Sequence, residues 1–271
     1  MADKNGDQPN QPKAEVSPTI DEEALKGLPN ASRLSWGIIK QPRRGPKGEL
    51  SIAKIVEAAI AIADQDGLSA VSMNRVASSL GYTPMSLYRY IESKEDLLIL
   101  MQDAVCDPNV PPQREYADWR EEMRAYVAAS VDVFTRHPWY ADIPIVSVPS
   151  TPNTLRYVDW AMRTMRNLPI SDYEKMSFLL LLSSYARAVG LIRRDMMLAM
   201  QAGGTPESFS GASFGPALRQ LVKPEQYPSL YPFIASGVYT GEQEQDNPIH
   251  DDLDFGLERI LDGMASYLER K

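Results

Sequence analysis

One short motif in the sequence has the residue types of a hydrolytic site. Gly211-Ala-Ser-Phe-Gly215 satisfies the G-x-S-x-G pattern around a nucleophilic serine, and Asp246 and His250 follow in the order Ser, Asp, His. This chemistry requires a buried strand before the serine and a helix directly after it. A Gly/Ser-rich stretch precedes the motif instead, and no βαβ pattern occurs in the sequence. A serine hydrolase using Ser213 is therefore a remote alternative, and we assign no catalytic residues.

Composition limits metal and disulfide chemistry. The chain has one cysteine, Cys106, and two histidines, His137 and His250. A single cysteine excludes an internal disulfide and a multi-cysteine metal site, and two histidines disfavour a zinc centre. We expect no metal and no cofactor.

A second group of polar side chains is arranged for binding rather than for catalysis. Ser72 is a good N-cap for a short helix that ends at Gly81, where glycine can take a positive φ. Thr83 then caps a second helix, with Pro84 at its first position. Two helices separated by one turn predict a helix-turn-helix.

The second helix of this unit has a polar outer face. Leu87 and Ile91 recur at helical spacing and point inward. The side chains left for the outside are Met85, Ser86, Tyr88, Arg89 and Tyr90. Such a face can hydrogen-bond phosphates and base edges, so this helix is the candidate reader of a DNA major groove.

The flanking elements carry a family resemblance. A helix with one apolar stripe precedes the unit, from about Ser51 to Gly67, and Ser93 caps a fourth helix with Asp96 at its third position. The fourth helix begins within Tyr-Arg-Tyr-Ile-Glu-Ser-Lys-Glu-Asp-Leu-Leu. Together these elements closely resemble the DNA-binding domain of the tetracycline-repressor (TetR) family over residues 51–105.

The resemblance implies which side chains contact DNA. Ser72 and Asn74 match positions that touch the backbone or a base edge, and Lys94 matches a phosphate-binding lysine. At Pro84 and Met85 hydrogen-bond readout is weak, so apolar contact with a thymine methyl is expected. The alternative for each is an ordinary exposed polar residue. The full set is Ser72, Asn74, Thr83, Met85, Ser86, Tyr88, Arg89, Tyr90 and Lys94.

The chain before this domain changes character twice. Residues 1–32 are polar and lack aromatic side chains, which predicts a disordered tail. Residues 33–48 carry basic residues with no acidic ones, and we interpret them as an arm that follows phosphates or enters the minor groove. A solvated linker is the alternative. Although the net charge is −8, groove binding requires only a local positive surface. The expected arm contacts are Arg43, Arg44 and Lys47.

The rest of the chain is helical by period, so the predicted fold class is all-α. Prolines after Asp107 break the fourth helix, which divides a DNA-binding domain at residues 49–106 from a second domain at residues 107–271. Four longer helices are expected there, beginning near Trp119, Thr154, Ser171 and Leu253. The region between Gly203 and the last helix is expected to form surface loops.

The second domain is expected to dimerise and to bind a small molecule. The third of its helices is apolar over more than one face, and Ala186, Ala188 and Gly190 would admit a close helix. With the last helix it could form a four-helix interface between two subunits, as in TetR-like proteins; a monomeric core is the alternative. Met and aromatic side chains are candidate pocket walls, although such residues are usually core, and His137 is a possible polar contact. The candidates are His137, Trp139, Tyr140, Tyr157, Trp160, Met162, Met165, Tyr185, Met196, Met197 and Met200.

These observations predict a cytoplasmic homodimer that binds a palindromic operator in double-stranded DNA. No run of consecutive apolar residues approaches a membrane span, and the N-terminus lacks the apolar region of a secretory signal. In the mechanism that the resemblance implies, a small apolar or aromatic effector makes a repressor release its operator. An activator or an effector-independent regulator is the alternative within the same class.

Overall fold

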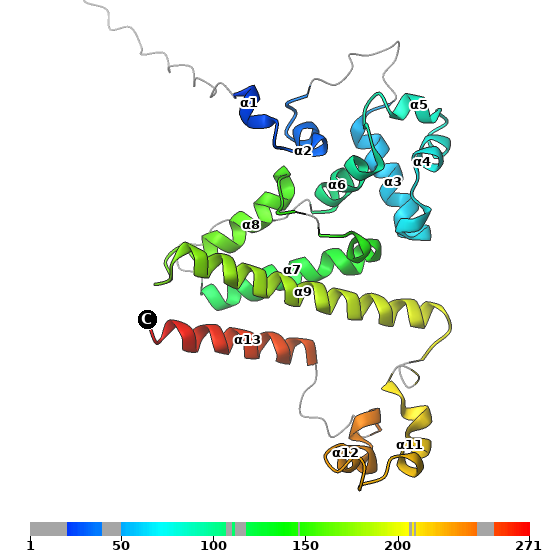
Figure 1. The fold of residues 1–271 in the computed structure, drawn as a ribbon, viewed down its shortest axis with the longest axis vertical. Helices are drawn as coiled ribbons and strands as arrows, with labels where there is room; N and C mark the ends of the chain where they lie inside the picture. Colours follow the sequence, from blue (N-terminus) through cyan, green and yellow to red (C-terminus); the bar gives the residue numbers. More distant parts are fainter. Residues whose placement is uncertain are drawn as a thin grey trace, which may run out of the picture.

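The structure is a computed structural model that describes residues 21–39, 50–106, 110–111, 118–145, 147–205, 208, 210–242 and 252–271. These residues form helices and no β-strand, which confirms the all-α class. Figure 1 shows an upper body of short helices above a lower body of longer ones. Each body has its own hydrophobic core.

The upper body contains the predicted helix-turn-helix. It consists of α3 (Ile52–Asp66), the 3₁₀ turn η1 (Leu68–Ala70), α4 (Met73–Ser79), α5 (Pro84–Leu87) and α6 (Lys94–Val105). The N-caps predicted at Ser72 and Ser93 are confirmed, because each accepts a backbone N–H from the third residue of its helix, and Ser51 does the same for α3. Thr83 occupies the N-cap position of α5 as predicted, but its side chain makes no capping hydrogen bond to the backbone. Gly81 has φ +75°, and this left-handed residue ends α4 as expected.

The second helix of the unit is shorter than its sequence predicts. Regular α-helix covers only α5, and turns follow it as far as Tyr90. The Ile91 N–H still donates to the Leu87 carbonyl at 3.0 Å, and both side chains are fully buried. The helix cannot continue because the chain must become extended at Ser93, which caps α6. Leu87 and Ile91 therefore point inward as expected, whereas Tyr90, expected on the outside, is half-buried and packs against the upper core.

Regular structure in the N-terminal tail begins at an earlier residue than its composition suggests. Disorder as far as residue 32 is wrong for residues 21–32, since α1 (Glu22–Leu25) and α2 (Asn30–Ser35) lie there. Ala31 and Ser32 are fully buried in the upper core. Composition misses this because the partners of α2 are distant in sequence. Residues 1–20, and the expected arm contacts Arg43, Arg44 and Lys47, lie outside the described residues.

The lower body is a bundle of four longer helices. α7 (Trp119–Arg136), α8 (Pro152–Thr164), α9 (Asp172–Gln201) and α13 (Asp252–Leu268) pack around a core centred on Met123, Leu182 and Leu261. α9 starts with the predicted capping box of Ser171 and Glu174. After α7 the 3₁₀ turn η2 (Pro138–Asp142) returns to the upper core, where Trp139 is buried.

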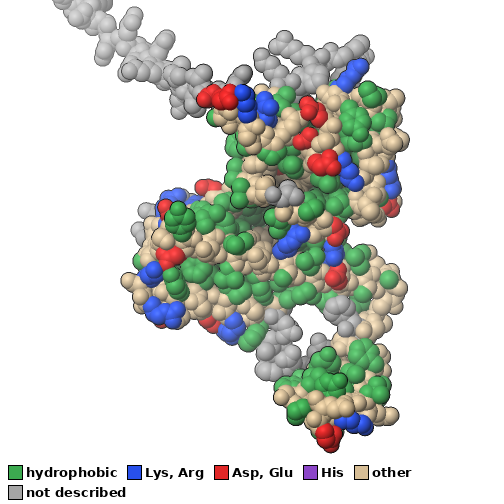
Figure 2. Space-filling view, viewed as in Figure 1, with side chains coloured by type: hydrophobic (Ala, Val, Ile, Leu, Met, Phe, Trp, Pro, Cys, Tyr) green, Lys and Arg blue, Asp and Glu red, His purple; other side chains and the backbone are tan. Residues whose placement is uncertain are grey.

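A small helical appendage follows α9. The expectation of loops between Gly203 and α13 is wrong for residues 212–240, which contain η3 (Ala212–Phe214), α11 (Gly215–Leu221), α12 (Tyr231–Ser236) and η4 (Val238–Thr240). Pro216 and Pro232 lie in the first turns of their helices, where a missing N–H costs nothing. The appendage projects below the end of α9, and apolar side chains gather over its surface (Figures 1 and 2).

α9 is apolar on two faces. By length and composition alone it could cross a membrane, the one such helix among the described residues, although no long run of consecutive apolar residues occurs in it. One face is buried and includes Leu179, Leu182, Ala186, Val189 and Gly190. Packing of this face along α7 explains part of the apolar composition. Ala186 and Gly190 therefore face their own subunit, whereas Ala188 is exposed.

Candidate nucleic-acid interface

Most of the predicted DNA-contacting side chains lie at the surface of the upper body. Ser72, Asn74, Thr83 and Arg89 are exposed, and Met85 and Tyr88 are 73% and 44% exposed. Ser86 and Tyr90 are half-buried. The Thr83 and Ser86 hydroxyls share a hydrogen bond of 3.0 Å, which orients both at the start of α5. The two helices that carry most of these residues, α4 and α5, pack against each other.

The basic side chains near this surface differ in whether they are free to contact DNA. Arg75 is ion-paired with Asp66 and is thereby partly neutralised. Arg89 forms no ion pair with any described residue, so its guanidinium is open to a phosphate or a base. Lys94 begins α6 and is half-buried at the rim of a hollow of about 380 Å³, which Asp142 of η2 also lines. Lys94 therefore lies between the DNA-binding helices and the lower body.

His137 and Trp139 lie at the junction of the two bodies. The Trp139 Nε1–H donates to Asp64 Oδ1 of α3 at 2.6 Å, and His137 Nδ1 is 2.8 Å from the same oxygen. Trp139 is 2% exposed and belongs to the upper core. Tyr140 is beside it, 3.4 Å from the Cys106 sulfur. These candidate pocket walls therefore connect α3 and α6 with η2. Nothing in the sequence distinguishes Asp64 from other helical aspartates, because only its tertiary contacts with His137 and Trp139 set it apart.

A second group of candidates lies together in the lower core. The rings of Tyr126 and Trp160 are 5.8 Å apart and nearly perpendicular, and the Tyr157 ring is 6.3 Å from Tyr126. Trp160 Nε1 donates to Glu122 Oε2 at 3.1 Å. Met162, Met165 and Tyr185 pack in the same core, whereas Met196, Met197 and Met200 are half-buried on the second half of α9. Tyr126 was not among the candidates, although its helical stripe contains it.

Burial keeps the titratable groups of this interior neutral. It raises the pKa of Tyr126 to about 12 and that of the Cys106 thiol to about 11. It also raises the pKa of Tyr140 well above its ordinary value. At neutral pH these three groups therefore carry no charge.

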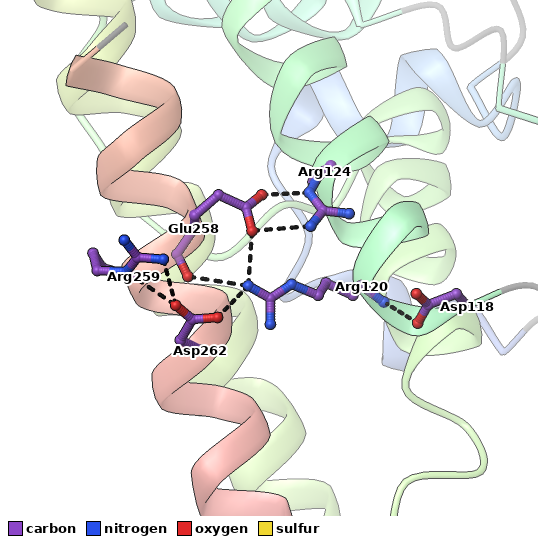
Figure 3. A network of polar contacts seen from close by, with 6 residues as sticks. All are labelled: Asp118, Arg120, Arg124, Glu258, Arg259 and Asp262. Atoms are coloured by element: carbon purple, nitrogen blue, oxygen red, sulfur yellow. Dashed lines mark hydrogen bonds and ion pairs between the residues drawn. The ribbon is translucent and has the colours of Figure 1, made fainter. Parts of the chain in front are cut away.

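A polar network fixes α13 to the start of α7 (Figure 3). The Arg124 guanidinium donates two hydrogen bonds to the Glu258 carboxylate, one of them 2.9 Å long. Arg120 donates to Glu258 at 2.7 Å and also to Asp262. Hydrogen bonds from Arg124 and then Arg120 lower the pKa of Glu258 to about 2. The network fixes the position of α13 against its own subunit.

None of the described residues covers the outer face of α9. Ala188 and Ser184 are exposed between larger apolar side chains at helical spacing. On α13, Phe255 is also exposed. Small residues between large ones let a second helix approach closely. The exposed apolar residues of α9 are Tyr173, Met176, Leu180, Leu181, Ile192 and Leu198.

The serine of the G-x-S-x-G motif lacks the surroundings of a nucleophile. Ser213 is exposed on the 3₁₀ turn η3, and the described residues before it form helix and turn rather than strand. Asp246 and His250 lie outside the described residues. The strand, nucleophile and helix arrangement is thus absent from the described part of the motif.

Fold and surface together define an all-α DNA-binding protein with a helix-turn-helix domain and a larger helical domain. Two family patterns match the chain: "Bacterial regulatory proteins, tetR family" over residues 55–101 and "Tetracyclin repressor-like, C-terminal domain" over residues 111–268. The chain belongs to the TetR family of bacterial transcriptional regulators.

Named relatives include a repressor and a regulator whose structure is known. The chain is 33% identical over 241 residues to the HTH-type transcriptional repressor DrrR1 of Streptomyces coeruleorubidus, covering 85% of this chain and 83% of the relative. Apo ActR from Streptomyces coelicolor is 25% identical with a TM-score of 0.64, covering 82% of this chain and 99% of ActR. ActR in complex with actinorhodin is 26% identical with a TM-score of 0.66, covering 81% and 97%.

Proposed function

We propose that this regulator is a homodimeric repressor whose operator affinity is lowered by a small aromatic effector. The exposed apolar face of α9 carries the proposal, because a soluble chain needs a partner for such a face. The similarity to DrrR1, a repressor, supports repression rather than activation. The protein acts in the cytoplasm, where its DNA is.

In the dimer, α9 and α13 pack against the same two helices of a second copy. A two-fold interface places identical faces together, so one stripe of exposed residues suffices for both subunits. The two helix-turn-helix units then read successive major-groove faces about 34 Å apart, which requires a palindromic operator.

The outer surface of α4 and α5 contacts this operator. Arg89 and Lys94 supply charge for phosphates, Ser72, Asn74, Thr83, Ser86, Tyr88 and Tyr90 supply hydrogen bonds, and Met85 supplies apolar contact in the groove. Arg43, Arg44 and Lys47 of the arm add phosphate or minor-groove contacts.

The effector binds among the aromatic side chains of the lower core. Tyr157, Trp160, Met162, Met165 and Tyr185 form its walls, and Met196 and Met197 adapt to its shape. His137, Trp139 and Tyr140 connect this region to α3 and α6 through Asp64 and Cys106. An effector that displaces η2 changes the position of the DNA-binding helices, with a coupling of about 1–3 kcal/mol.

Binding to the promoter DNA that flanks the gene tests the repressor. A salt titration should give selective binding, and Arg89→Ala and Arg44→Ala should each reduce the salt slope by about two, one contact in each subunit. Arg166→Ala is the matched control, because Arg166 is exposed on the lower body away from this surface. Equal salt slopes for wild type, Arg89→Ala and Arg166→Ala would remove the assigned interface.

Actinorhodin is the first effector to try, followed by other planar aromatic molecules. A molecule that releases the operator should bind Trp160→Phe or Tyr157→Ala at least tenfold more weakly, because each loses aromatic contact, a loss of about 1.4 kcal/mol. Tyr88→Phe, in the DNA-binding domain, should bind the effector as wild type does. Unchanged effector affinity in both lower-core variants would place the effector elsewhere.

A further inference from the structure

The N-terminal segment of residues 21–39 lies before the family's DNA-binding pattern, which begins at residue 55. Its helix α2 is nevertheless packed like a core element, with Ala31 and Ser32 fully buried and Leu34 nearly so. Figure 1 shows α2 beside α6 and above one end of α8. This segment therefore touches both bodies of the molecule.

The first attachment of α2 is to α6. The Ala31 N–H donates to Asp96 Oδ1 at 2.9 Å, and both groups are buried. The other carboxylate oxygen of Asp96 accepts from the Ser93 hydroxyl at 2.8 Å. Asp96 forms no ion pair with any described residue, so neutral donors alone compensate its burial. Loss of the Ala31 donor would leave a buried oxygen unsatisfied.

The second attachment of α2 is to the chain that leads into α8. The Ser32 and Ser150 hydroxyls share a hydrogen bond of 2.7 Å. The Trp36 Nε1–H donates to the Ser150 carbonyl at 2.9 Å. Ser150 precedes Thr151, the N-cap residue of α8, so these contacts hold the start of that helix.

A third contact closes a ring. Asp103, buried near the end of α6, accepts the backbone N–H groups of Asn153 and Thr154 at 2.8 and 3.3 Å. These are the first amides of α8, which have no partner inside the helix. α2 thus binds α6, α6 binds α8, and the lead into α8 binds α2. Without α2, the Asp103 contact alone would fix α6 to the start of α8 in this ring.

We propose that residues 21–39 are a positioning brace that fixes the angle between α6 and α8, and through it the placement of the helix-turn-helix. α6 belongs to the DNA-binding core, and α8 belongs to the lower body that carries the dimer helices. An operator selects one placement of two recognition helices, so a looser angle lowers the fraction of dimers ready to bind.

The test uses the full chain with Ser32→Ala and Trp36→Phe combined, which removes both bonds to Ser150. Ser35→Ala is the matched control, since among the described residues its hydroxyl bonds only within α2, to the Ser32 carbonyl at 2.9 Å. Trp36→Phe alone is a second variant that cannot disturb the core, because Trp36 is 49% exposed. Spin labels at Ser78→Cys and Asp159→Cys, both exposed, report the distance between α4 and α8.

Labelled subunits diluted with unlabelled ones keep one pair of labels in each dimer. We expect one narrow distance for wild type and Ser35→Ala and a broad distribution for the double variant, with Trp36→Phe between them. Operator affinity should fall roughly 5- to 20-fold in the double variant, as two lost hydrogen bonds imply. Affinity for unrelated DNA should stay the same, because no charge changes.

An unchanged distance distribution in the double variant overturns the proposal. Equal operator affinity for wild type and double variant does so as well. The affinity readout rests on the proposed function, whereas the distance readout does not. A wild type that binds no operator therefore contradicts the repressor, while the distance measurement still decides the brace.

Discussion

The upper body and α9 differ in how far a single chain buries their apolar side chains. In the upper body the inward residues of α3 to α6, such as Ile55, Leu87 and Leu97, are fully buried within one chain. In α9 one face is equally buried, but the other leaves Leu180 67% exposed. A single subunit therefore completes the DNA-reading unit and leaves the surface of α9 incomplete. The two regions should respond differently to the same kind of substitution.

Leu180→Glu is the strongest test of the exposed apolar face of α9. If this face meets its copy, the two-fold axis brings two carboxylates to an apolar interface. Dimerisation should weaken at least roughly 1,000-fold, about 4 kcal/mol. Sedimentation velocity at micromolar concentration would show a folded monomer. Met85→Glu, equally exposed on α5, should remain dimeric while losing the operator, and a dimeric Leu180→Glu would locate the interface elsewhere.

Leu97→Ala tests the buried core of the upper body. Leu97 is fully buried in α6, so removing its side chain leaves a cavity and should lower the free energy of unfolding by about 3 kcal/mol. Denaturant unfolding followed by circular dichroism measures this. Met85→Ala, at a 73% exposed position, should change it by less than about 0.5 kcal/mol. Similar values for both would mean that the upper core is loosely packed.

Gly190→Ala tests the buried face of α9. A Cβ at this position would overlap the Phe134 ring of α7, so α7 and α9 would have to move apart. We expect a loss of about 2 kcal/mol in unfolding free energy. Gly263→Ala in α13 meets nothing within 4 Å and should instead stabilise, by about 0.5–1 kcal/mol, through helix propensity. Thermal unfolding of both variants separates the two effects, and equal melting temperatures would contradict the close approach.

Glu258→Gln gives the smallest effect and depends on pH. Because the folded pKa of Glu258 is about 2 and its ordinary value is 4.5, its charge stabilises the fold above pH 4.5. That contribution disappears as the pH falls from 4.5 towards 2. The network is open to solvent, so the loss at pH 7 is about 1 kcal/mol or less. Melting curves of both proteins should converge at low pH, and a pH-independent difference would assign the effect to packing.

The sequence predicted best those elements whose signals are local. Ser72, Ser93 and Gly81 decide their helix ends through neighbouring backbone groups, and all three act as expected. The same is true of Ser171 with Glu174 at the start of α9. The apolar stripes identified the core because helical period alone separates inward from outward positions.

Elements held by distant partners escaped prediction. α2 is short and polar, and only Asp96 and Ser150 explain its order. Aromatic spacing also did not separate the two environments of the candidate site, because Trp139 and Trp160 have the same chemistry. Trp139 is at the junction since it meets Asp64, and Trp160 is in the lower core since it meets Tyr126. Such pairings arise from the tertiary fold, and the helical periodicity of the sequence does not predict them.

The two buried aspartates of α6 attach the helix to its neighbours near both ends, so a rotation about one end displaces the other. Asp96 lies near its first turn and Asp103 near its last, and a helix rises about 1.5 Å per residue, so the helix is about 18 Å long. A rotation of roughly 10° about the Asp103 end, within the range of known switching motions, displaces the other end by about 3 Å. In the proposed dimer, two-fold symmetry would double this to about 6 Å between half-sites that must match a DNA turn of about 34 Å. That mismatch approaches two base pairs, so in the proposed dimer a modest tilt would weaken operator binding.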